Sequence, residues 1–132
     1  HDQLFLSNPI KFSEILLKNR IQQFKKSDDI KSDFKFFDRG IPDIIAYLNY
    51  KSISCDEKFD LALKKFRYDL IFLAEPWEDI FRGDNERYES FEELKIINKY
   101  LKKIYFDYGE KVIVLPKSSV QKRVKFIISK IK

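Results

Sequence analysis

Charged residues able to handle phosphate or metal ions stand where two apolar runs end. Asp38 and Arg39 directly follow the aromatic run 34–37. Lys117 comes shortly after the apolar run 111–115. A carboxylate can hold a metal ion or orient a hydroxyl group, and Arg and Lys side chains pair with phosphate oxygens. These residue types in these positions indicate phosphate chemistry.

Two further arginines lie in the long polar connection 76–89, within a candidate lid region of about 76–92. Arg82 and Arg87 stand close to Gly83. The connection exceeds the usual length of about 2–6 residues between a strand and a helix. This pattern is typical of a lid that closes over phosphate. It is equally typical of a surface loop whose arginines are ion-paired, and the sequence does not separate the two.

Asp38 has a second interpretation that needs no ligand. Asp is a common N-cap residue, and a helix is predicted to begin at Ile41. We favour the functional interpretation because Arg39 and Gly40 follow Asp38 directly.

The spacing of apolar residues predicts alternating helices and short strands. Helices are expected over 9–26 and 41–50, from Ser54 with Glu57 through Phe66, from Ser90 with Glu93 through Tyr108, and from Ser118 with Gln121 through Ile131. The Ser–x–x–Glu or Gln pattern is a capping box. Strands are expected over 34–37, 68–74 and 111–115.

Short apolar strands separated by amphipathic helices predict an α/β fold with a parallel sheet. In such sheets, ligands bind beyond the carboxyl ends of the strands. We therefore expect Asp38, Glu75 and Pro116 at one edge of a single sheet.

Composition excludes several classes of protein. A chain of 132 residues, 44% hydrophobic, suits one domain with a packed core. No apolar run approaches the ~20 residues that span a bilayer. The single Cys55 excludes a disulfide framework and favours a reducing cytoplasm. Because the single histidine is His1, neither a Cys/His zinc cluster nor an internal Ser–His–Asp triad can form.

The net charge of +5 is concentrated near the C-terminus. Seven basic residues and no acidic residue follow Glu110, whereas 1–110 holds 19 basic and 21 acidic residues. The simplest interpretation is a solvated basic helix face. The alternative is a surface for nucleic acid or anionic lipid. Lys outnumbers Arg twenty to six, which speaks weakly against readout of bases, where Arg dominates.

The glycine-rich loop that usually cradles phosphate is missing from this sequence. Its three glycines are Gly40, Gly83 and Gly109, and none precedes a lysine, as the Walker pattern requires. The chain also begins at His1 and contains no Met. We therefore expect a strand, loop and helix upstream, and we expect the 132-residue chain alone to bind ATP weakly or not at all and to be inactive.

Four strings in order resemble one family. They are FFDRGIPDIIAYL at 36–48, RYDLIFLAEPWEDI at 67–80, ERYESFEE at 86–93 and VIVLPKSSVQKRVKFI at 112–127. Together they resemble the AAA-type P-loop ATPase family that includes NadR-like ribosylnicotinamide kinase domains. The resemblance implies a three-layer, P-loop kinase-like fold with a parallel sheet in the strand order 2-3-1-4-5. Residues 1–132 would form the C-terminal portion of that single domain, without its first strand and P-loop helix.

The resemblance also implies roles for the charged residues. Asp38 and Arg39 would face the acceptor and a magnesium ion, with Asp38 as the metal ligand. Arg82 and Arg87 would belong to the lid. All four would then be catalytic residues.

The turn 116–118 would lie beside the base of the bound ATP or GTP, through Pro116, Lys117 and Ser118. Three functions then compete: an ATPase or small-molecule kinase using Mg²⁺, a nucleotide-binding regulator without turnover, and a basic surface that binds nucleic acid or anionic lipid. Residues with phosphate chemistry at the strand ends favour the first two.

Overall fold

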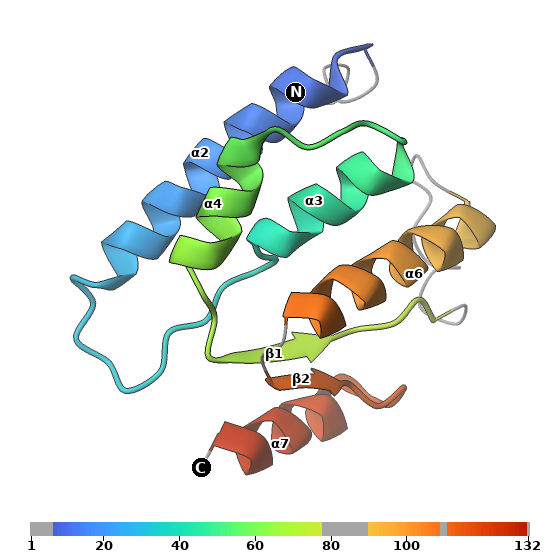
Figure 1. Cartoon of the computed structure of the whole chain (residues 1–132). Helices are drawn as coiled ribbons and strands as arrows, with labels where there is room; N and C mark the ends of the chain where they lie inside the picture. The colour runs from blue at the N-terminus through green and yellow to red at the C-terminus, as the bar shows by residue number, and fades with distance from the viewer. Residues whose placement is uncertain (1–6, 78–89, 109–110, 132) are drawn as a thin grey trace. The chain divides into compact units, whose positions relative to one another are not determined.

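The computed structural model describes residues 7–77, 90–108 and 111–131 (Figure 1). The chain divides into two compact units, His1–Arg67 and Tyr68–Lys132. The expectation of one domain over 1–132 stays a prediction.

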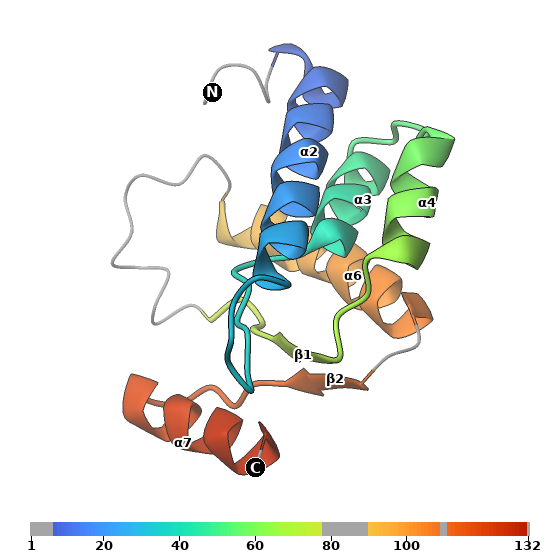
Figure 2. The same cartoon turned by 90° about the vertical axis from the view of Figure 1, so that its left-hand side faces the viewer.

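The unit His1–Arg67 contains three helices, α2 (Pro9–Ser27), α3 (Ile41–Tyr50) and α4 (Glu57–Lys65). Helix α3 contacts both α2 and α4 (Figure 2). The core lies around α3, and its buried apolar residues are Leu17, Ile41, Ile44, Ile45, Ala46, Leu48, Phe59 and Ala62. The helices predicted over 9–26 and 41–50 are therefore confirmed.

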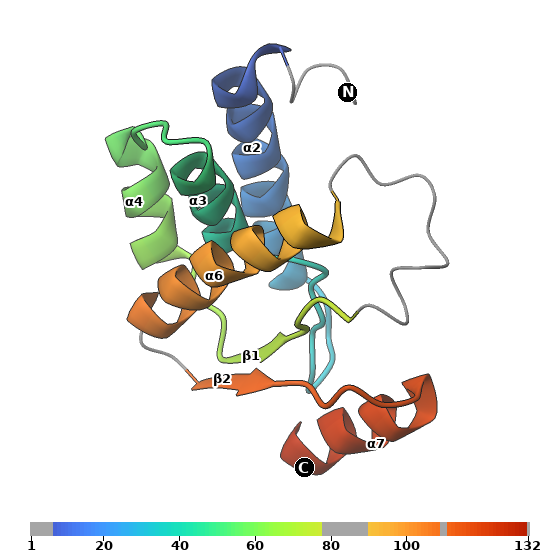
Figure 3. The same ribbon diagram turned by 90° about the vertical axis from the view of Figure 1, so that its right-hand side faces the viewer.

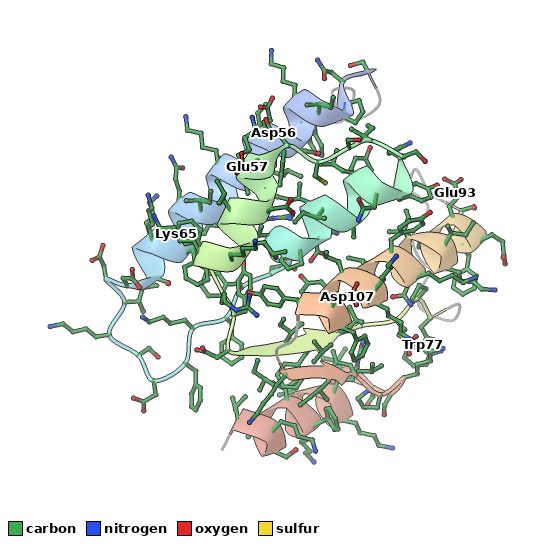
Figure 4. The ribbon with its side chains drawn as sticks, viewed as in Figure 1. Asp56, Glu57, Lys65, Trp77, Glu93 and Asp107 are labelled. Carbon is green, nitrogen blue, oxygen red and sulfur yellow. The ribbon has the colours of Figure 1, made fainter. Side chains whose placement is uncertain are left out.

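Local capping explains where these helices begin. Asn8 Oδ1 accepts a hydrogen bond from the Lys11 backbone N–H at 3.1 Å, directly before Pro9 at the first turn of α2. Helix α4 has acidic residues in its first turn and basic residues in its last turn, as the helix dipole favours (Figure 4). The predicted cap Ser54 is wrong, because the N-cap residue is Asp56, whose backbone is extended.

The segment 34–37 is not a strand, and that prediction is wrong. An extended segment becomes a strand when a neighbouring strand pairs with its backbone, and in the described part of the chain the two strands pair with each other. The aromatic side chains of this segment are exposed or packed on another aromatic ring. Phe34 and Phe36 are 49% and 74% exposed, whereas Phe37 stacks on Phe24 with ring centroids 5.5 Å apart.

The unit Tyr68–Lys132 contains β1 (Leu70–Leu73), α6 (Phe91–Tyr108), β2 (Lys111–Val114) and α7 (Val120–Ile131). The two strands are parallel. In all three ribbon views, α6 lies next to β1 and α7 lies next to β2 (Figure 3). The strands expected within 68–74 and 111–115 and their parallel pairing are confirmed, and the full three-layer sheet stays a prediction.

Two serines begin the helices of this unit. Ser90 Oγ accepts a hydrogen bond from the Glu93 backbone N–H at 3.1 Å, which confirms Ser90 as the cap of α6. For α7 the expected cap Ser118 is wrong by one position. Ser119 Oγ accepts from the Lys122 backbone N–H at 3.2 Å, because the turn after β2 extends one residue further.

Candidate functional site

Two polar segments leave the carboxyl ends of β1 and β2 side by side. The strands are parallel and in register, with Leu73 opposite Val114. Beyond the strands, the Leu115 backbone N–H donates to the Leu73 carbonyl oxygen at 2.9 Å. Glu75 and the turn 116–118 therefore leave the same edge of the sheet, where ligands of parallel α/β folds bind.

Glu75 is held in its ionised form at this edge. Its carboxylate accepts hydrogen bonds from Lys102 Nζ at 2.6 Å and from Asn98 Nδ2 at 3.4 Å, both on α6. The hydrogen bond from Lys102 lowers the pKa of Glu75, and the positive charge of Lys117 lowers it further. Glu75 therefore links the end of β1 to α6 through its ionised carboxylate.

The sequence analysis did not identify Asn98 and Lys102. Asn98 stands four residues after Leu94 and three before Leu101, so it interrupts the apolar face of α6. It is 8% exposed, and its Oδ1 has no hydrogen-bond partner among the described residues. A polar residue at apolar helical spacing was the available signal for Asn98. Lys102 offered none, since its contact depends on how α6 crosses β1.

The turn 116–118 presents a positive charge at the same edge. Lys117 is exposed, and Pro116 and Ser118 are half-buried. The turn leads into the N-terminus of α7, where backbone N–H groups favour anions. The chemistry of this segment suits a phosphate or another anionic group.

Asp38 lies in the other unit, in the turn before α3. Asp38 and Arg39 are exposed, and Arg39 has a left-handed backbone with φ 66°. The buried Gly40 fixes the end of the turn, because its carbonyl oxygen accepts a hydrogen bond from Arg20 Nη1 at 2.7 Å. The left-handed backbone of Arg39 costs energy because Arg has a Cβ, so the surrounding contacts must hold it.

The interpretation of Asp38 as a helix cap is wrong. Gly40 is the N-cap residue of α3, and its backbone N–H donates to Asp43 Oδ1 at 3.3 Å. The Asp43 side chain therefore supports the start of α3 without Asp38. The Asp38 carboxylate is left exposed on the turn.

The predicted lid lies largely outside the described residues. Arg82 and Arg87 fall within 78–89, so the prediction that they close over phosphate stays a prediction. Asp38 and Arg39 belong to the unit His1–Arg67, and the turn 116–118 belongs to the unit Tyr68–Lys132.

The carboxylates of the described residues are too dispersed to hold a metal ion by themselves. Within 7–77, 90–108 and 111–131, no three His, Cys, Asp or Glu residues gather as metal ligands. Mg²⁺ commonly uses one or two carboxylates together with waters and substrate phosphates. An exposed carboxylate such as Asp38 fits that mode, whereas a cage built from protein ligands alone does not fit the described residues.

Comparison with known proteins identifies the family of this chain. The family model described as "AAA domain" matches residues 1–123. The chain therefore belongs to the AAA domain family, whose members bind nucleotides. No curated protein and no solved structure matches the chain. None of the described helices is long and apolar enough to cross a membrane.

Proposed function

We propose that this domain binds ATP or GTP with Mg²⁺ and either hydrolyses it or transfers its terminal phosphoryl group to a small molecule. One observation carries the proposal. The carboxyl ends of two parallel strands meet at one edge in a chain of the AAA domain family, and Lys117 supplies positive charge there. Parallel sheets of this class bind their ligands at that edge.

In this proposal, Asp38 orients the attacking water or the acceptor hydroxyl, or holds Mg²⁺ through a water molecule. Its exposed carboxylate and its freedom from a capping role support this assignment. Bound Mg²⁺ would neutralise charge on the phosphate oxygens. Arg39, adjacent on the same turn, would pair with a phosphate oxygen.

The remaining roles concern the phosphoryl group and the base. Arg82 and Arg87 would neutralise charge as the phosphoryl group moves, since this chemistry depends mostly on positioning and electrostatic stabilisation. The turn 116–118 would lie beside the nucleotide base. Glu75 would act indirectly, because its bonds to α6 fix the edge from which that turn leaves.

The test is steady-state turnover of Mg-ATP and Mg-GTP by the protein, expressed with any coding sequence that precedes His1. The variant is Asp38→Asn, which removes the negative charge and keeps the shape. The matched control is Asp33→Asn, an exposed aspartate in the same connection to which no role is assigned. Asp38→Asn should lower kcat about 100-fold or more and change nucleotide binding far less. Asp33→Asn should leave both unchanged.

The outcome separates the competing functions. Wild-type kcat in Asp38→Asn would refute the role of Asp38. Tight nucleotide binding without turnover by the wild type would point to a regulatory domain. Arg87→Ala should slow turnover and raise KM, since an arginine on the phosphate contributes to binding as well as to the transition state.

A further inference from the structure

Helix α7 exposes an apolar stripe inside the most basic part of the chain. None of its residues is buried. Val120, Val124 and Ile128 are 76%, 48% and 41% exposed. Residues four apart lie on the same side of a helix, so these three side chains form one continuous stripe.

Basic residues accompany the stripe, and acidic residues do not. Helix α7 carries Lys122, Arg123, Lys125 and Lys130, and the turn before it carries Lys117. No acidic residue follows Glu110, whereas residues 1–110 have two more acidic than basic residues. The positive charge is therefore a property of this region and not of the whole surface.

We propose that α7 docks on the surface of an anionic lipid bilayer, with Val120, Val124 and Ile128 in the interface and the exposed lysine side chains on lipid head groups. A helix with a narrow apolar face and Lys or Arg on its polar face lies in the plane of such an interface. Long lysine side chains can bury their methylenes beside the stripe and keep their ammonium groups at the head groups.

The charge of α7 and its apolar stripe together favour an anionic bilayer over other partners. Nucleic acid would match the charge but would leave the apolar stripe in water. A second copy of α7 would cover the stripe but would bring two basic surfaces together. An anionic bilayer satisfies both features at once. This docking goes beyond the proposed nucleotide chemistry, and its test contains no nucleotide, so either can fail without the other.

The test is co-sedimentation of the full chain with vesicles. One set contains phosphatidylcholine alone, and the other contains phosphatidylcholine with phosphatidylserine. Binding should require phosphatidylserine. It should also fall when salt rises from about 0.1 M to about 1 M, which shortens the Debye length from about 10 Å to about 3 Å.

Two pairs of variants separate the apolar and the charged contributions. Val124→Gln should weaken binding to the phosphatidylserine vesicles about tenfold, whereas Leu61→Gln, at a 57% exposed position of α4, should not change this binding.

Lys122→Gln with Lys125→Gln should weaken the vesicle binding about 25-fold, near fivefold for each charge. The control, Lys99→Gln with Lys103→Gln on the exposed side of α6, should have little effect. Far-UV circular dichroism checks that each variant is folded.

Several results would overturn the proposal. These are absence of binding to the phosphatidylserine vesicles, equal binding to both kinds of vesicle, and a Val124→Gln variant that binds as tightly as the wild type. Salt-sensitive binding to duplex DNA without vesicle binding would assign the surface to nucleic acid. A dimer in solution that Val124→Gln dissociates would assign the stripe to a second copy.

Discussion

Helix α3 in the unit His1–Arg67 and helix α7 in the unit Tyr68–Lys132 have similar lengths and opposite surroundings. Six of the ten residues of α3 are buried, and none of the twelve residues of α7 is. Both helices carry apolar residues at helical spacing. They differ in charge, since α3 has no basic residue and α7 has four. Apolar spacing therefore predicts a helix and its apolar face, whereas neighbouring elements decide whether that face is covered.

Truncating one isoleucine in each helix tests whether the α7 face is uncovered, as the α3 face is covered. Ile44 is 2% exposed and Ile128 is 41% exposed. Ile44→Ala should lower the free energy of unfolding by about 3 kcal/mol, because it leaves a cavity in the core. Ile128→Ala should change it by less than about 0.5 kcal/mol. Urea unfolding measures both, and equal losses would show that the α7 face is covered in solution.

The hydrogen bond from Arg20 is expected to stabilise the turn before α3 in the first unit. Its guanidinium donates to the carbonyl oxygen of the buried Gly40, which ends the Asp38 turn. Arg20→Ala should cost about 2 kcal/mol, since a hydrogen bond from a charged group is lost and a buried carbonyl loses a partner. The control Lys18→Ala, at an exposed position of the same helix, should cost little. If both variants lost the same free energy of unfolding, the hydrogen bond from Arg20 would not stabilise the turn.

Glu75 provides the corresponding test in the second unit. Its pKa lies below the ordinary 4.5, so its ionised form stabilises the fold above that pH, and this contribution is lost as pH falls through the lowered pKa. Glu75→Gln should therefore cost about 1 kcal/mol at neutral pH and nothing in strong acid. Glu92→Gln, in an exposed pair with Lys95 at 3.5 Å, should cost less. A loss independent of pH would mean that packing, not charge, is what Glu75 contributes.

The half-buried Cys55 tests how well the first unit shields a side chain, and the expected change is in its rate of alkylation. Burial raises the pKa of the Cys55 thiol above 9.0, and the negative charge of Asp60 raises it further. The thiolate is the reactive form, so iodoacetamide should alkylate the folded chain several-fold more slowly than the urea-unfolded chain at pH 8. Alkylation at equal rates would show that this part of the unit does not shield the thiol.

Local signals predicted much of the fold. The apolar spacing over 41–50 predicted α3 (Ile41–Tyr50) correctly, because such spacing acts within one or two helical turns. The strand expected over 34–37 failed because a strand depends on a partner distant in sequence, which a run of aromatic residues does not reveal. The caps at Asp56 and Ser119 were missed by one or two positions, where several capping residues stand together.

The candidate site was less predictable from the sequence. The strand ends located Glu75 and Pro116 correctly at one edge, because parallel strands share their direction. The expectation that Asp38 follows a strand of the same sheet was wrong, because 34–37 is not a strand. The partners of Glu75 were missed because they come from α6, and their contact depends on the packing of that helix. The alternative interpretation of Asp38, as the cap of α3, was wrong, because Gly40 is the N-cap residue and the Asp43 side chain reaches back to it.

The parallel pairing of β1 and β2 also has a consequence for the order of folding. Position 70 pairs with 111 and position 73 with 114, so each rung of the sheet must close a long loop that includes α6. The cost of closing a loop grows with its length, and contacts between distant positions form slowly. Helices α3 and α4 are near neighbours in sequence and in contact, so they need no such closure. Pulse-labelling hydrogen exchange during refolding should therefore protect the amides of α3 before those of β1, and simultaneous protection would show that the two units fold as one.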